Sequence, residues 1–257
     1  MKKILFIGLF ALLSVLSARA YDFEVDDIAY NIISATEVEV TYKGKSFAGM
    51  NQGYSGSVVI PSTVTYGDTT YHVTAIGAQA FYECKKMTSV TIPESVTTIG
   101  QGAFFNCTGL ISVTMPESVT TIGREAFCNC TGLTSVVLPP SVTSVGTSVF
   151  SECIGLTSVT IPEGVTFIGD YAFSGCRGLT SVAIPKRVNI IGVGAFRNSG
   201  LISVAIPESV TSIGDMAFGG CYGLVSVTSW AENPPVCEGH VFLEDMTEQR
   251  FTCRAGV

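Results

Sequence analysis

The residues that most readily do chemistry are few and scattered. The chain has two histidines, His72 and His240, and nine cysteines. A metal site can be drawn from Cys237, His240 and Cys253, but three ligands with one long gap fall short of a closed zinc site. Ser and Thr are so abundant that no Ser–His–Asp set stands out, and no glycine motif would cradle a phosphate. We therefore expect no catalytic residue, no metal and no cofactor.

The elements around these residues repeat with a period of about 23 residues. Glycine, proline, cysteine and phenylalanine all follow this period, and the unit reads LTSVTIPESVTTIGxxAFxxCxG. The phased phenylalanines are Phe81, Phe104, Phe127, Phe150, Phe173, Phe196 and Phe218. Such a strict repeat predicts a solenoid in which equivalent residues form ladders, and this phenylalanine ladder is the predicted core.

Each unit predicts one coil of the solenoid. The residues before each proline alternate between apolar and polar types and predict a strand, which the proline ends because it has no N–H to donate. A glycine marks a corner, and Ala126-Phe127 predicts a single helical turn that sends the ring inward. The fold class expected is a β-rich solenoid of short parallel strands with single helical turns, preceded by an N-terminal β cap.

The repeat resembles the BspA-like leucine-rich repeat family of bacterial surface and secreted proteins. The pattern LTSVTIPESVTTIGxxAFxxCxGL carries the resemblance over residues 57–228, and YDFEVDDIAYNI is similar to the N-terminal cap of such proteins in Bacteroidetes. The resemblance implies a right-handed leucine-rich repeat coil and links the chain to adhesion to host proteins or to other bacteria. The expected organisation is a β cap at 21–56, repeats at 57–228 and a partial C-terminal cap at 229–257.

The first twenty residues predict a signal peptide that is cleaved after Ala20. Lys2 and Lys3 precede an apolar run that ends at Leu16, and this run of about thirteen residues is too short to span a membrane, which needs about twenty. Cleavage leaves eleven basic and 21 acidic residues, a net charge of −10. We therefore expect a secreted or cell-surface protein without a transmembrane segment, and the acidity argues against nucleic acid as a partner.

Three features lie outside the strict ladder. Residues 65–73 form an insertion that predicts a protruding hairpin around Gly67-Asp68, and Asp68-Thr69-Thr70 resembles the O-glycosylation sequon of exported Bacteroidetes proteins, with Thr69 as the acceptor. The phased cysteines are expected to be small buried hydrophobes, because stacked equivalent residues point in parallel and do not face each other as a disulfide requires. Cys237 and Cys253 lie outside the ladder and are candidates for a disulfide in the cap.

The predicted functional feature is the outward surface of the first strand of each unit. It is rich in hydroxyl groups, and the sixth unit carries Lys186-Arg187 where other units carry Glu-Ser. The candidate binding residues are Thr88, Thr91, Ile111, Thr114, Thr134, Thr157, Thr160, Thr180, Lys186 and Arg187. We expect a protein partner from the host or a bacterial surface. A plain solvated sheet, a glycan ligand and a structural or carbohydrate-binding role in the envelope remain open alternatives.

Overall fold

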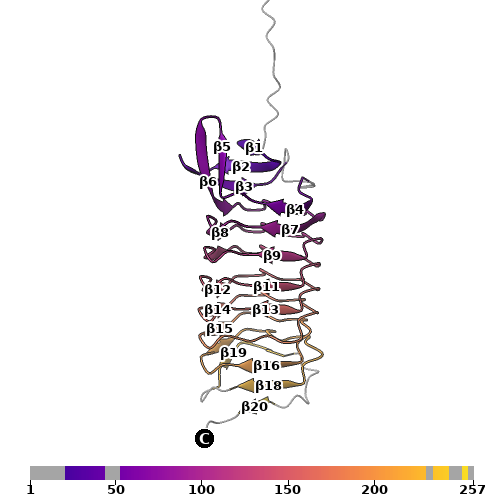
Figure 1. Cartoon of the computed structure of the whole chain (residues 1–257). Coiled ribbons are helices and arrows are strands. Elements are labelled where there is room, and N and C mark those ends of the chain that lie inside the picture. The colour runs from indigo at the N-terminus through magenta and orange to yellow at the C-terminus, as the bar shows by residue number, and fades with distance from the viewer. Residues whose placement is uncertain (1–20, 44–52, 230–233, 243–250, 254–257) are drawn as a thin grey trace, which may run out of the picture.

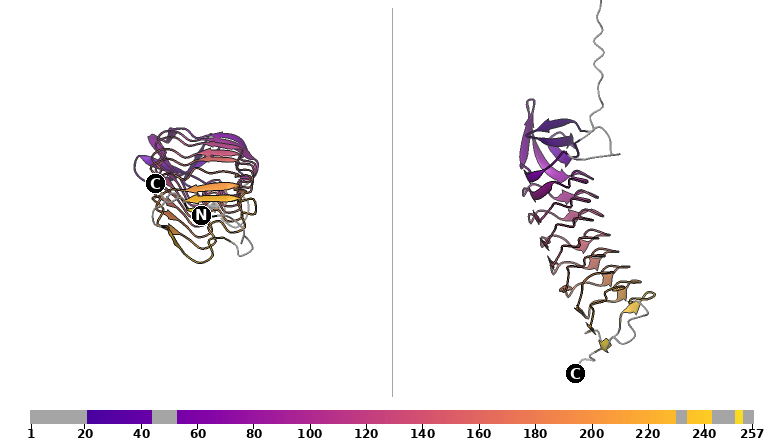
Figure 2. Two further views of the ribbon diagram at one scale, coloured as in Figure 1. Left: turned by 90° about the horizontal axis from the view of Figure 1, so that it is seen from below. Right: turned by 90° about the vertical axis from the view of Figure 1, so that its right-hand side faces the viewer.

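A computed structural model describes residues 21–43, 53–229, 234–242 and 251–253. These residues form a β-solenoid of about seven turns, with a small antiparallel unit at its N-terminal end (Figure 1). Figure 2 shows from two further directions that the coils lie one above another along the length of the molecule. The described residues contain no helix. The predicted signal peptide lies outside them.

The N-terminal unit is a three-stranded meander joined to the first coil. It contains β1 (Phe23–Val25), β2 (Ile28–Ile32) and β3 (Glu37–Thr41), paired antiparallel. Val38 and Val40 on β3 are fully buried, as expected from their alternation with polar residues. β3 then pairs in parallel with β6 (Thr69–Ile76), so that the meander continues directly into the solenoid.

The insertion forms the predicted hairpin. β5 (Thr63–Tyr66) pairs antiparallel with β6, and Tyr66 lies opposite Thr69. Gly67 has φ 59°, which suits a two-residue hairpin loop because primed turns need positive φ. The hairpin projects beyond the first coil (Figure 1).

Each coil contributes one strand to each of two faces of the solenoid, except that the sixth coil has no strand on the first face. The first face contains β4 (Gly56–Val59), β7 (Met87–Thr91), β9 (Ser112–Thr114), β11 (Ser135–Val137), β13 (Ser158–Thr160), β16 (Ser203–Ile206), β18 (Ser226–Ser229) and β20 (Phe251–Cys253). The second contains β6, β8 (Thr98–Ile99), β10 (Thr121–Ile122), β12 (Ser144–Val145), β14 (Phe167–Ile168), β15 (Ile190–Ile191), β17 (Ser212–Ile213) and β19 (Val236–Cys237). Paired strands are parallel and follow the repeat, as in Ser135 opposite Ser158.

The corner after each glycine is built from tight turns, so the predicted single helical turn is wrong. Glu125 and Asn129 both have φ 59°, which interrupts a right-handed helix on either side of Ala126-Phe127. The N–H of Ala126 donates within its own coil to Gly123 O at 3.2 Å, whereas that of Phe127 donates to Val149 O of the next coil at 2.9 Å. Alternate N–H groups thus bond between coils, which a helix would not allow.

The predicted phenylalanine ladder is the centre of the core. All seven rings are fully buried, and successive rings stack with centroids 4.9–5.6 Å apart. The ladder continues at one end to Phe242, 5.7 Å from Phe218, and at the other end Tyr54 lies 4.7 Å from Phe81. The sequence reading missed Phe242 because it follows Phe218 by 24 residues and Val241 replaces the usual alanine.

The six phased cysteines are buried free thiols, as expected. Five of them also donate a hydrogen bond from the thiol to the backbone carbonyl of a phenylalanine in an earlier coil, for example Cys130 Sγ to Phe104 O at 3.1 Å. In the sixth unit Ser199 replaces the cysteine and its hydroxyl lies 3.3 Å from Cys221 Sγ. The thiol column therefore satisfies buried carbonyl groups as well as filling space.

Candidate binding surface

The outward side of the first face, which we call the strand face, is an exposed sheet surface without charged side chains on its strands. Its inward valines, such as Val90, Val136 and Val204, are 2–4% exposed and pack in the core. Its outward residues form three columns. The first runs Thr88, Ile111, Thr134, Thr157, Thr180, Ile202 and Val225; the second is serine throughout, from Ser57 to Ser226; the third runs Val59, Thr91, Thr114, Val137, Thr160, Ala183, Ala205 and Thr228.

All ten candidate binding residues are exposed. Eight of them lie in the first and third columns of the strand face, and Lys186 and Arg187 lie at its edge, one residue and two residues after Pro185. Several apolar residues interrupt the hydroxyl groups, including Ile111 at 54% exposure and Val225 at 69%. The strand face therefore offers both hydrogen-bonding and apolar contacts to a partner. The role of these ten residues in binding stays a prediction.

The sixth coil departs from the repeat, because residues 181–185 do not form the expected strand. The strand face consists of three separately paired groups, β4-β7-β9, β11-β13 and β16-β18-β20. Between β13 and β16 this face has no strand at all (Figure 1). Val159 and Val182 are partly exposed, although the equivalent valines of the other units are buried. The coils are thus less tightly joined at this point of the solenoid.

A side-chain hydrogen bond between coils is also missing in this part of the solenoid. In other coils a serine after the proline corner donates to a carbonyl of the preceding coil, as Ser118 Oγ does to Val96 O and Ser209 Oγ to Val188 O, both at 2.7 Å. Gly164 and Arg187 stand at this position in the fifth and sixth units. Neither can make the serine bond, so the fifth and sixth coils each lack one link to the coil before.

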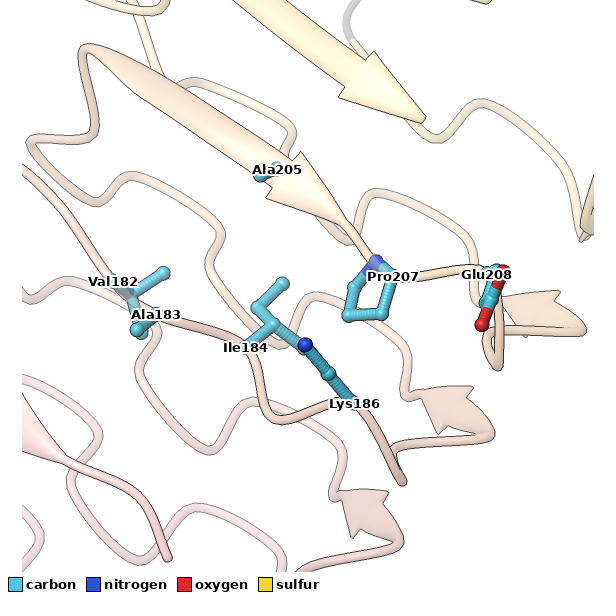
Figure 3. A pocket seen from close by; sticks show the side chains of 7 residues that line it. All are labelled: Val182, Ala183, Ile184, Lys186, Ala205, Pro207 and Glu208. Carbon is cyan, nitrogen blue, oxygen red and sulfur yellow. The ribbon is translucent and has the colours of Figure 1, made fainter. Parts of the chain in front are cut away.

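A cavity of about 410 Å³ opens at the break, between the sixth and seventh coils (Figure 3). It is lined by Val182, Ala183, Ile184, Lys186, Ala205, Pro207 and Glu208. In the third column these two alanines replace the threonine or valine of the other coils, so the surface is hollowed where the side chains are smallest. Within the part of the chain that the structure describes, Lys186 and Glu208 form no ion pair.

Of the residues that line this cavity, the sequence reading singled out Lys186 alone. The other six look like ordinary repeat residues when each unit is read by itself. The signal that was available is the succession of Ala183 and Ala205 in a column that otherwise holds β-branched residues.

The remaining predicted sites lie away from the strand face and from one another. Thr69 is half-buried on the hairpin, whereas His72 and His240 are exposed at opposite ends of the described chain. Cys237 has a free, exposed thiol, and it lies on β19 of the second face while Cys253 lies on β20 of the first. The side chain of Cys253 is outside the described structure, so the disulfide stays a prediction without support from the backbone.

The thiols are not poised for nucleophilic chemistry. Burial raises the pKa of Cys128, the one half-buried thiol beside the ladder, to about 11, and that of Cys176 to about 12. Both are therefore protonated at neutral pH, and the thiol rather than the thiolate is a poor nucleophile. Among the described residues no group of three or more His, Cys, Asp or Glu is arranged to hold a metal ion. No helix in the described ranges has the length and hydropathy of a membrane span.

Comparison with known proteins identifies the class. The model of the BspA type leucine rich repeat region matches residues 57–180 and 144–242, with six copies of the repeat. The chain belongs to this family of leucine-rich repeat proteins, as the resemblance predicted. No curated protein matches it.

Solved structures of similar proteins share the fold. A leucine rich cell surface protein from Faecalibacterium prausnitzii is 37% identical, with a TM-score of 0.73 over 83% of this chain and 55% of that one. This chain thus spans little more than half of that protein's length. A leucine rich repeat protein of T. pallidum is 28% identical, with a TM-score of 0.59, and the match covers 85% of this chain and 86% of that one. A leucine-rich repeat protein from Bacteroides ovatus is 25% identical, with a TM-score of 0.52, and the match covers 90% of this chain and 78% of that one.

Proposed function

We propose that this protein is a non-catalytic binding protein, secreted or held at the cell surface, that adheres to host proteins or to other cells through the strand face. The observation that carries the proposal is the strand face itself, an exposed sheet of hydroxyl and small apolar groups with no charge on its strands. Solenoid faces of this extended kind suit protein ligands, because many weak contacts add up over several coils. The predicted signal peptide and the similarity to a cell surface protein support an exported location.

A second candidate is a carbohydrate-binding or structural role in the bacterial envelope. The rings of Tyr82 and Phe105 stack 5.0 Å apart and nearly parallel, and both are half-buried at the turn corner. The exposed edges of such a stacked pair offer apolar contact area to a ligand. A glycan array distinguishes this function from protein adhesion.

The test is binding of the chain from residue 21 onward to immobilised host matrix and plasma proteins and to bacterial cells. Ile111→Arg and Thr134→Arg place bulky charges on the strand face and are expected to weaken binding by about tenfold or more, because a buried unpaired charge is costly at an interface. Thr121→Arg, exposed on β10 of the second face, is the matched control and should bind as the parent does. Absence of binding in the whole panel, or equal binding by all variants, contradicts adhesion through this face.

A further inference from the structure

The break in the strand face leaves a row of backbone groups without partners. In the described structure the N–H and C=O groups of Ser181 to Ile184 take part in no hydrogen bond. The neighbouring coils show what is missing, because β16 pairs with β18 at the equivalent positions and β11 pairs with β13. The sixth and seventh coils keep the bond before the row, from Ile202 N–H to Thr180 O at 3.0 Å. An extended peptide offers donors and acceptors at the spacing that such a row requires.

The cavity beside this row has apolar walls. Ile184 is 8% exposed, and Val182 and Pro207 are partly exposed. Figure 3 shows the side chains of Ile184 and Pro207 next to each other, with Ala205 on β16 above them. Its volume of about 410 Å³ is at the small end of the range for ligand pockets, roughly 300–1,000 Å³. It is therefore large enough to take one large apolar side chain of a ligand.

The charges around the cavity determine which type of ligand residue is favoured next to that apolar side chain. The residue after the proline is Glu94, Glu117, Glu163 or Glu208 in four other units, and Lys186 in the sixth is followed by Arg187. Both cations are exposed, and within the described ranges neither has an acidic partner within ion-pair distance. An acidic group of a ligand would thus find two cations here, on an edge that elsewhere repels it.

We propose that the break between β13 and β16 is a peptide-binding site, which takes an extended segment of a protein partner that inserts one large apolar side chain and carries an acidic residue close to it. The backbone of the segment pairs with Ser181 to Ile184, the apolar side chain fills the cavity, and the carboxylate lies against Lys186 and Arg187. The peptide site rests on the proposed function, because both require a protein ligand. The site specifies which kind of segment of that ligand is recognised.

The probes are short fluorescent peptides, acetylated and amidated, made of Ser and Thr except for a central Leu and a Glu two residues later. Two further peptides carry Gly in place of the Leu, or Lys in place of the Glu. In fluorescence polarisation the parent peptide should bind roughly tenfold more tightly than the Gly peptide, because a buried leucine side chain supplies most of the affinity. The preference over the Lys peptide should be about threefold, since the charged pair is exposed to solvent.

Two protein variants locate the binding. Ala205→Leu narrows the cavity and should weaken binding of the parent peptide by about tenfold or more. Thr228→Leu, in the same column one coil further on, should leave that binding unchanged. Lys186→Glu should remove or reverse the preference for the Glu peptide, and Lys85→Glu, an exposed lysine at another corner, should not. Hydrogen exchange of the amides of Ser181 to Ile184 should slow when peptide is bound, because those groups become paired.

The peptide measurements either support or overturn the peptide-binding site. No binding of the parent peptide at millimolar concentration overturns it, as does binding that Ala205→Leu leaves intact while its thermal unfolding matches that of the parent protein. If the peptides fail while Ile111→Arg still abolishes adhesion to host proteins or cells, the peptide site is wrong and adhesion through the strand face stands. If the peptides bind as described but no host protein or cell does, the site stands and the adhesive function falls.

Discussion

The Tyr54 hydroxyl accepts a hydrogen bond of 3.0 Å from the backbone N–H of Ala29, in the middle of the N-terminal meander. The same hydroxyl donates to the carbonyl of Thr41 at 2.9 Å, and the ring of Tyr54 lies against Phe81, the first ring of the ladder. One side chain thus connects the meander to the core of the solenoid. Burial raises the pKa of this phenol above its ordinary value, so it stays protonated and keeps its donor.

Tyr54→Phe should lower the free energy of unfolding by about 1–3 kcal/mol, because the N–H of Ala29 and the carbonyl of Thr41 are left buried without this partner. Urea denaturation followed by circular dichroism measures the effect. Tyr222→Phe, at an 82% exposed tyrosine, is the control and should change stability by less than about 0.5 kcal/mol. Equal stability of the two variants would show that the hydroxyl is not needed at the junction.

Phe150→Ala should cost about 3–5 kcal/mol, because it removes the middle ring of the ladder and leaves a cavity between two stacked neighbours. Thr134→Ala, on the exposed first column, should cost under about 0.5 kcal/mol. Equilibrium unfolding of both proteins checks the assignment of faces. Losses of similar size at the two sites would contradict it.

Gly164→Ser should stabilise the solenoid by adding a link between the fourth and fifth coils. A Cβ atom at this position would lie 3.9 Å from Val142 O, so a serine hydroxyl can make the bond that the other corner serines make between coils. The matched control is Gly164→Ala, which supplies the same backbone stiffening without the hydroxyl. The serine variant should be more stable than the alanine variant by about 0.5–1.5 kcal/mol in denaturant unfolding, and no difference would show that the bond does not form.

Alkaline pH should destabilise the protein through its buried thiols. Burial raises the pKa of Cys84 and of Cys176 to about 12 from an ordinary value of 9.0. Above pH 9 the unfolded chain therefore loses protons that the folded chain keeps, and the free energy of unfolding falls as the pH rises towards 12, by up to about 1.4 kcal/mol per pH unit for each thiol.

The measurement is urea denaturation at several values between pH 8 and pH 11. Replacing Cys84 and Cys176 together by alanine should make the decline with pH shallower, even though the variant is less stable at pH 8. Cys237→Ala removes an exposed thiol and should leave the slope close to that of the parent. If the double alanine variant loses stability with pH as steeply as the parent, groups other than these two thiols control alkaline unfolding.

The sequence by itself determined the coil and its two surfaces. A period of 23 residues brings equivalent side chains into contact whenever coils stack, so the positions of Phe127 or Phe150 in one unit imply the whole ladder. The alternation of apolar and hydroxyl residues before each proline likewise separated the core from the strand face. The hairpin around Gly67 followed from the extra residues in the first unit.

Only the tertiary structure decided the corner and the break. Left-handed φ at Glu125 and Asn129 is unusual for residues other than glycine, and it persists because the alternate N–H groups then bond to the next coil. The cavity likewise depends on residues of neighbouring coils, since Ala183 and Ala205 line it together. Such differences between neighbouring coils are small in sequence, yet they remove hydrogen bonds that exist only when the coils are stacked.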